Sequence, residues 1–301
     1  MTRGAESVGL ARGPNRRRAR SSTDDLPYSA GHDGRPLPER LERYFWRRWK
    51  RLLQRIDRRA PQMHVFVAGM QRSGTNMLMN MLDWSRYTEA IHETDPRGFA
   101  RYEMRPPVEI EALARQSNAP FFVIKSLCEL DQLGDLMDRL APAKTLWIVR
   151  DFDGSVCSAL RSFGNFVEQL RRLAQDRNAG AWRGRGMSDA THALLRRLYH
   201  ADISEASAAA LMWYYRNVLF FERGLDHDSR VCLLFYEDMA RQREVESARI
   251  FDFLGIPGWS PWICRKIASH SMKNKLCDGI APEVREVCAG LLARFHVAKA
   301  R

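Results

Sequence analysis

Four short apolar runs recur along the chain, and each has the length of a buried strand. They lie at residues 64–68, 121–124, 145–149 and 231–236. Their residues do not alternate between apolar and polar types, which is typical of strands that are covered on both faces in a parallel sheet. Stretches with helical periodicity separate them, at residues 76–84, 130–140, 155–173 and 206–221.

This alternation of strands and helices predicts an α/β fold with a doubly wound parallel sheet of about four to five strands and helices on both faces. We expect a single domain over residues 61–301. Residues 1–36 are rich in Gly, Pro, Ser and Arg and offer little to pack, so they are predicted to form a disordered basic tail. Residues 174–190 contain several glycines and arginines and are predicted to be a mobile loop, of the kind that can act as a lid.

Between the tail and the domain, residues 37–60 have the pattern of a basic amphipathic helix. Arginines and a lysine surround one apolar face, which is formed by Leu41, Phe45, Trp49, Leu52 and Ile56. We expect this apolar face to dock on the domain. The alternative is that residues 38–59 lie on a membrane surface or clamp an anionic substrate, since Trp46 and Trp49 stand beside so many arginines.

The composition shows that the chain is strongly basic. The 48 Lys and Arg residues against 36 Asp and Glu residues give a formal net charge of +12, which suits anionic partners without choosing among them. The six cysteines have neither CxxC nor zinc-ligand spacing, so reduced and mostly buried thiols are expected. No apolar run could cross a membrane, and the N-terminus lacks the apolar core of a secretory signal. We therefore expect a cytoplasmic protein, either soluble or attached to a membrane surface.

The most informative segment is residues 67–76, Val-Ala-Gly-Met-Gln-Arg-Ser-Gly-Thr-Asn, which follows the first strand and opens a helix. Gly69 and Gly74 have the glycine spacing of the phosphate-binding loop GxxxxGK[ST], whose backbone N–H groups point at an anion. The segment therefore predicts a P-loop-type fold. A degenerate loop of a nucleotide hydrolase and a purely structural turn are the alternatives.

The departures from that motif predict a different chemistry. Thr75 replaces the lysine of a kinase or ATPase, and Asn76 replaces its magnesium-binding Ser or Thr. A magnesium-dependent enzyme would thereby lose the cation that contacts the γ-phosphate and the side chain that binds the metal. Arg72 supplies the positive charge instead, which suits a donor without a triphosphate and a transfer that needs no metal.

This loop resembles the 5′-phosphosulfate loop of the PAPS-dependent sulfotransferases, a P-loop superfamily, and the chain is most similar to its bacterial and Golgi-like members. In the family a basic residue precedes Ser-Gly-Thr-Thr or Ser-Gly-Thr-Asn. Residues 147–158 are similar to the family's 3′-phosphate element, an Arg at a strand end followed eight residues later by Ser, here Arg150 and Ser158. The alternative for this second element is a surface pair of Arg150 with Asp151 and a helix capped by Asp153 or Ser155.

The resemblance extends over roughly residues 63–296 and implies that the chain is an enzyme with PAPS (3′-phosphoadenosine 5′-phosphosulfate) as its sulfo donor and no metal. The implied donor-binding residues are Arg72, Ser73, Gly74, Thr75, Asn76, Arg150 and Ser158. Residues 236–239 (Tyr-Glu-Asp-Met) and 250–257 also look like family segments. The family's late Arg-Lys-Gly element is absent, and residues 270–275 are the candidate replacement.

Two catalytic residues are predicted. Arg72 would stabilise the negative charge that develops on the oxygen between sulfur and phosphate during in-line transfer. The acceptor hydroxyl needs a general base, and the histidine that cytosolic members carry two residues after a lysine is absent from Lys125-Ser-Leu127. Glu93 is at the position where Golgi-type relatives use a glutamate. Its local competitor is His92, and Lys125 is a candidate contact for the sulfo group or an acidic acceptor.

The acceptor would be a hydroxyl group on a carbohydrate, a lipid-linked compound or a small molecule. A P-loop small-molecule kinase is the rival enzyme. A nucleic-acid-binding protein is the rival outside enzymology, although the chain has no recognised nucleic-acid-binding motif and we expect no nucleic acid partner.

Overall fold

A five-stranded parallel sheet forms the centre of the structure, a computed structural model that describes residues 37–56, 62–267 and 276–300. In spatial order its strands are β2 (Thr88–Ile91), β5 (Phe121–Ser126), β1 (Met63–Ala68), β6 (Ala143–Val149) and β7 (Val231–Phe235). All four apolar runs are strands of this sheet, as predicted. The strand β2 was not predicted, because its sequence Thr-Glu-Ala-Ile is short and half polar. A separate antiparallel pair consists of β3 (Phe99–Ala100) and β4 (Glu103–Met104).

Thirteen α-helices occur in the described part of the chain. They are α1 (Leu37–Ile56), α2 (Thr75–Asp83), α3 (Pro107–Gln116), α4 (Leu133–Arg139), α5 (Phe152–Ser162), α6 (Phe166–Gln175), α7 (Asp189–Leu198), α8 (Glu205–Asn217), α9 (Leu219–Glu222), α10 (Tyr236–Arg241), α11 (Arg243–Leu254), α12 (Pro261–Cys264) and α13 (Pro282–Lys299). Short 3₁₀ helices are found at Leu130–Gln132, Arg177–Arg183 and Leu225–His227. No described helix is both long and apolar enough to cross a membrane.

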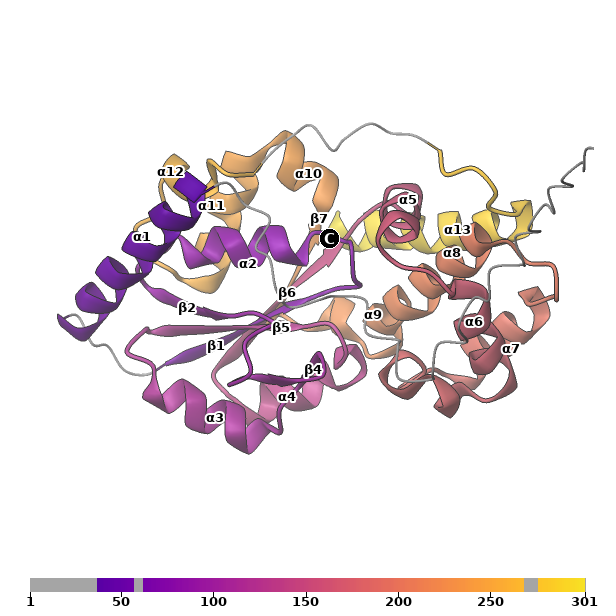
Figure 1. The fold of residues 1–301 in the computed structure, drawn as a ribbon, viewed down its shortest axis with the longest axis horizontal. Helices are drawn as coiled ribbons and strands as arrows, with labels where there is room; N and C mark the ends of the chain where they lie inside the picture. Colours follow the sequence, from indigo (N-terminus) through magenta and orange to yellow (C-terminus); the bar gives the residue numbers. More distant parts are fainter. Residues whose placement is uncertain (1–36, 57–61, 268–275, 301) are drawn as a thin grey trace, which may run out of the picture. The chain divides into compact units, whose positions relative to one another are not determined.

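The two faces of the sheet bury two separate cores, because successive strand residues point in opposite directions. Phe66, Phe122 and Trp147 face the core that is covered by α3 to α9 and α13. Val65 and Val123 face the other core, which is covered by α2 and α10 to α12. Figure 1 shows α3 and α4 on one side of the strands and α2, α10 and α11 on the other. The predicted doubly wound arrangement is therefore confirmed.

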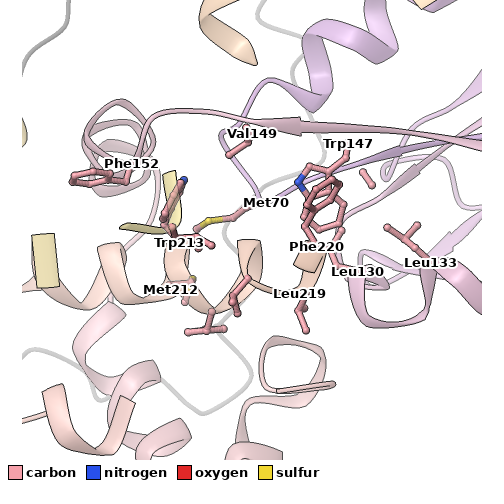
Figure 2. Packing of buried hydrophobic residues seen from close by; sticks show 14 of the residues in the cluster. Met70, Leu130, Leu133, Trp147, Val149, Phe152, Met212, Trp213, Leu219 and Phe220 are labelled. Carbon is pink, nitrogen blue, oxygen red and sulfur yellow. The ribbon is translucent and has the colours of Figure 1, made fainter. Parts of the chain in front are cut away.

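The first core holds the start of α5 against α8 and α9. The ring of Trp147 at the end of β6 lies 5.2 Å from that of Phe220, and the ring of Phe152 lies 5.8 Å from that of Trp213 (Figure 2). These four aromatic side chains connect the last strand residues to the chain segment that follows them. That segment contributes Arg150, and its position is consequently fixed by buried packing. The six cysteines are free thiols, and five of them are buried, as predicted.

Two predicted boundaries were wrong. Residues 155–173 do not form one helix, since α5 ends at Ser162 and α6 begins at Phe166, after Asn165 in the left-handed region with φ 64°. Residues 174–190 are not simply a loop, because they contain a 3₁₀ helix that starts where Asp176 accepts a hydrogen bond from the backbone of Asn178. A turn that contains Gly184 and Gly186 follows this 3₁₀ helix, which the overall periodicity did not reveal.

The orientation of α1 is the largest difference from the prediction. We expected its apolar face to dock on the domain, but the residues of that face are exposed to solvent. The buried side chains of the helix are polar instead: Arg43, Lys50 and Gln54. Among the described side chains of α1, Trp46 makes large aromatic contacts with the domain, with its ring 5.0 Å from that of Trp262.

The reason for this orientation is the C-terminal end of α2. Asp83 is buried there, and its carboxylate accepts hydrogen bonds from Arg47 at 2.8 Å and from Lys50 at 3.2 Å. Its backbone oxygen accepts two more, from Lys50 and from the indole of Trp46. Burial alone would raise the pKa of Asp83, but Lys50 and Arg47 hold it well below its ordinary value. The charged face of α1 is therefore the face that the domain binds.

Replacing Asp83 with asparagine is expected to lower the free energy of unfolding by about 3 kcal/mol, because Lys50 would stay buried without its counter-ion. Urea denaturation followed by circular dichroism measures this change. Because the pKa of Asp83 is lowered by folding, its contribution is present above about pH 4 and is lost at lower pH. The difference between wild type and variant should shrink accordingly in acid. Asp202→Asn, at a side chain that is 94% exposed, is the control and should change stability by less than about 0.5 kcal/mol.

Candidate active site at the sheet edge

All five strands of the parallel sheet end at one edge, and the residues of the candidate site lie at or near those ends. The loop of residues 69–74 comes after β1, and Arg150 comes directly after β6. Lys125 is paired in register with Val67, one residue before β1 ends. Tyr236 comes directly after β7. The carboxyl edge of a parallel sheet is where α/β proteins bind ligands.

The loop after β1 is curled for anion binding. Arg72 and Gly74 both have positive φ angles, 70° and 106°, with Ser73 between them. Gly74 is the N-cap of α2 and makes no side-chain hydrogen bond to the first N–H groups of that helix, and such N–H groups at a helix start commonly bind anions. A Cβ atom on Gly74 would lie 2.6 Å from the ring of Tyr236, so only glycine fits here. The hydroxyl of Ser73 is fully buried and has no hydrogen-bond partner within the described part of the chain.

The structure brings the two predicted donor-binding elements together. The Arg72 Nε atom donates to Ser158 Oγ at 2.9 Å, across 86 residues of sequence. The Arg150 Nη1 atom donates to the backbone oxygen of Arg72 at 3.3 Å. Arg72, Arg150 and Ser158 therefore belong to one site.

Several neighbours surround Arg150. It lies over the ring of Tyr236, 4.4 Å from the ring centroid. A Cβ atom on Gly154 would approach the guanidinium to 2.9 Å, so this glycine leaves room for it. Trp213 donates to the backbone oxygen of Arg150 at 2.9 Å. The cap of α5 is Asp151, which accepts from the backbone of Asp153 at 2.9 Å, so the expected alternative of a cap by Asp153 or Ser155 was wrong.

Lys125 joins the candidate base to the phosphate-loop helix. Its Nζ atom donates to Glu93 Oε1 at 2.5 Å and to Asn76 Oδ1 at 2.7 Å. Burial lowers the pKa of Lys125, and Glu93 opposes this effect, whereas the positive charge of Arg72 adds to it. Through Asn76, the second residue of α2, Lys125 is connected to the helix that follows the loop. Glu93 is thus connected to the start of α2 through Lys125.

His92, the alternative base, is largely buried beside Glu93. Burial lowers the pKa of His92 to about 4, although the nearby Asp83 acts in the opposite direction. The imidazole is therefore neutral near pH 7 and a weak proton acceptor.

Sequence reasoning missed the supporting residues of this site. Tyr236 was noticed only as part of a similar segment, although its ring contacts both Arg150 and Gly74. Trp213 and Gly154 gave no signal, because their roles arise from contacts between distant segments. Residues 270–275, the candidate replacement for the family's late element, lie outside the described residues.

Comparisons with known proteins agree with this arrangement. A family model described as "Sulfotransferase domain" matches residues 62–281. A search of curated proteins found no match. Among solved structures, the chain is similar to the sulfotransferase domain from the curacin biosynthetic pathway, with 13% identity, a TM-score of 0.50, and coverage of 78% of this chain and 98% of that one.

Two further solved structures have lower scores. A sulfotransferase from Alicyclobacillus acidocaldarius has 16% identity and a TM-score of 0.48, over 80% of this chain and 97% of that one. The mouse sulfotransferase SULT7A1 complexed with PAP has 16% identity and a TM-score of 0.44, over 80% of this chain and 88% of that one.

The fold and the family model thus define an α/β enzyme with an arginine-containing loop at the carboxyl edge of its sheet. Since the matching family model covers well over half of the chain, the chain belongs to the sulfotransferase family. It is a transferase that moves a sulfo group to an acceptor, and the prediction of this activity is confirmed.

Proposed function

We propose that the sulfo donor is PAPS and that the site transfers its sulfo group to an acceptor hydroxyl without a metal ion. Arg72, Ser73, Gly74, Thr75 and Asn76 would bind the 5′-phosphosulfate end. Arg150 and Ser158 would bind the 3′-phosphate. When bound, this donor supplies a sulfo group attached to a phosphate that can depart.

The contact between Arg72 and Ser158 is the observation that carries this proposal. A donor with phosphate groups at two ends needs two anion-binding elements at a fixed separation, and this contact joins the two elements directly. The residues also fit such a ligand chemically. The buried Ser73 hydroxyl and the buried Nε atom of Arg150 have no hydrogen-bond partner within the described residues, and each could donate to a phosphate oxygen.

Within the site, each side chain has a separate task. Arg72 and the backbone N–H groups at the start of α2 would stabilise the negative charge on the oxygen that leaves sulfur. Glu93 would accept the proton of the attacking hydroxyl. Lys125, which contacts both Glu93 and Asn76, would keep the base oriented toward the loop. The proposed acceptor is a hydroxyl compound, either a carbohydrate, a lipid-linked compound or a small molecule.

Isothermal titration calorimetry with adenosine 3′,5′-bisphosphate, Mg-ATP and a random oligonucleotide tests the donor assignment. The bisphosphate is expected to bind at least about tenfold more tightly than the other two, and equally well in EDTA, because both of its phosphates would be held by arginines. Preferential binding of Mg-ATP would favour a kinase. Preferential binding of the oligonucleotide would favour a nucleic-acid-binding protein.

A further inference from the structure

The exposed face of α1 is an apolar surface that the sulfotransferase site does not use. We call it the apolar stripe, and it consists of Leu37, Leu41, Tyr44, Phe45, Trp49, Leu52 and Ile56. Each of these side chains is between 48% and 76% exposed. They recur every three or four residues, so they lie along one side of the helix. Seven of the twelve exposed large apolar side chains in the described part of the chain are in this stripe.

The opposite face of α1 is committed to the domain. Arg43 donates to Asn80 at 2.9 Å, Lys50 and Arg47 bind Asp83, and Gln54 donates to the backbone oxygen of Thr88 at 2.9 Å. These polar contacts fix how the helix is rotated about its axis. The apolar stripe therefore points away from the domain.

Basic side chains flank the stripe on one side. Arg48, Arg51 and Arg55 are exposed. The acidic residue Glu42 is engaged elsewhere, because it forms ion pairs with Arg265 and Lys266. The exposed part of α1 thus combines an apolar face with positive charge, and it carries Tyr44 and Trp49, the aromatic types that are enriched at the level of lipid headgroups.

We infer that α1 binds the surface of a membrane that contains anionic lipids, with the apolar stripe inserted among the lipids and Arg48, Arg51 and Arg55 contacting the headgroups. The positive charge beside the stripe favours an anionic membrane over a second copy of the chain. A second copy of the chain would bring two sets of arginines close together, whereas anionic headgroups neutralise them. Residues 1–36 would be a poor cover for the stripe, since they contain few large apolar residues among many polar and basic ones.

Flotation of the full chain with lipid vesicles tests this inference. The protein is expected to bind vesicles of phosphatidylcholine mixed with phosphatidylglycerol, and to bind pure phosphatidylcholine at least about tenfold more weakly. The variant Phe45→Ser/Trp49→Ser/Leu52→Ser should bind the mixed vesicles at least about a hundredfold more weakly. The variant Arg48→Gln/Arg51→Gln/Arg55→Gln should lose about a hundredfold on mixed vesicles only, since each basic residue contributes about fivefold.

The matched control is Val245→Ser/Val297→Ser, which changes two exposed apolar residues on α11 and α13 and should bind like wild type. Circular dichroism should show that every variant unfolds at the wild-type temperature. Equal binding by wild type and the triple serine variant would overturn the inference. A dimer in sedimentation velocity that the same variant makes monomeric would also overturn it, and would assign the stripe to a second copy. Lipid binding is measured without any sulfo transfer, so it does not depend on the proposed donor.

Discussion

Replacing Arg72 with alanine is expected to lower kcat/KM for sulfo transfer about a thousandfold. A positioned donor that stabilises developing negative charge contributes about 10²–10³ in rate. The substitution also removes the contact with Ser158 that joins the two anion-binding elements. Transfer can be measured by incubating the enzyme with PAPS and an extract of metabolites and cell envelopes, and by detecting the sulfo-group mass gain of acceptors.

Arg161→Ala is the matched control for this variant. Arg161 lies on α5, three residues after Ser158, and its side chain is exposed to solvent. It should keep wild-type activity, which would show that the loss reflects the site and not the overall positive charge. Undiminished transfer by Arg72→Ala would remove this arginine from the mechanism.

Replacing Glu93 with glutamine is expected to lower kcat by about 10²–10⁴, the range attributed to general base catalysis. The amide keeps the size of the side chain and its acceptor oxygen for Lys125, but it cannot take a proton from the acceptor. Affinity for adenosine 3′,5′-bisphosphate should stay within about twofold of wild type, because Glu93 does not belong to the donor-binding elements. Both quantities can be measured on the same preparation.

A purely structural role for Glu93 predicts a different result. As the counter-ion of the buried Lys125, Glu93 could support the site without exchanging protons. In that case the variant would keep the wild-type dependence of kcat on pH, with a lower value throughout. If Glu93 is the base, the fall of kcat at low pH should disappear in the variant. Glu111→Gln, at a partly exposed glutamate of α3 that pairs with Arg115, is the control for loss of a carboxylate.

The fold could be predicted from the sequence where the signal was local. The apolar runs that became β1, β5, β6 and β7 are continuous, and the loop after β1 has fixed glycine spacing. The orientation of α1 could not be predicted in this way. Its periodicity identified the apolar face correctly, but the side that meets the domain is decided by Asp83, a buried carboxylate on α2 that needs Arg47 and Lys50. The sequence pattern of one helix does not show that a buried charge on another helix needs its basic side chains.

The residues of the candidate site also differ in whether the sequence could predict them. Arg72, Arg150 and Ser158 were predicted because they belong to sequence motifs, and the structure places them in contact. The support that Tyr236 and Trp213 give to Arg150 was not predicted, because it depends on how β7 and α8 meet the end of β6.

The helix α2 has a role in the geometry of the whole reaction. It begins at Thr75 in the donor loop and ends at Asp83, to which α1 is attached. Nine helical residues rise about 14 Å, so one short helix separates the proposed donor site from the attachment point of α1. An enzyme that rests on a bilayer through α1 would work at a limited height above it, and would favour hydroxyls that stand close to the lipid surface over those on long flexible chains.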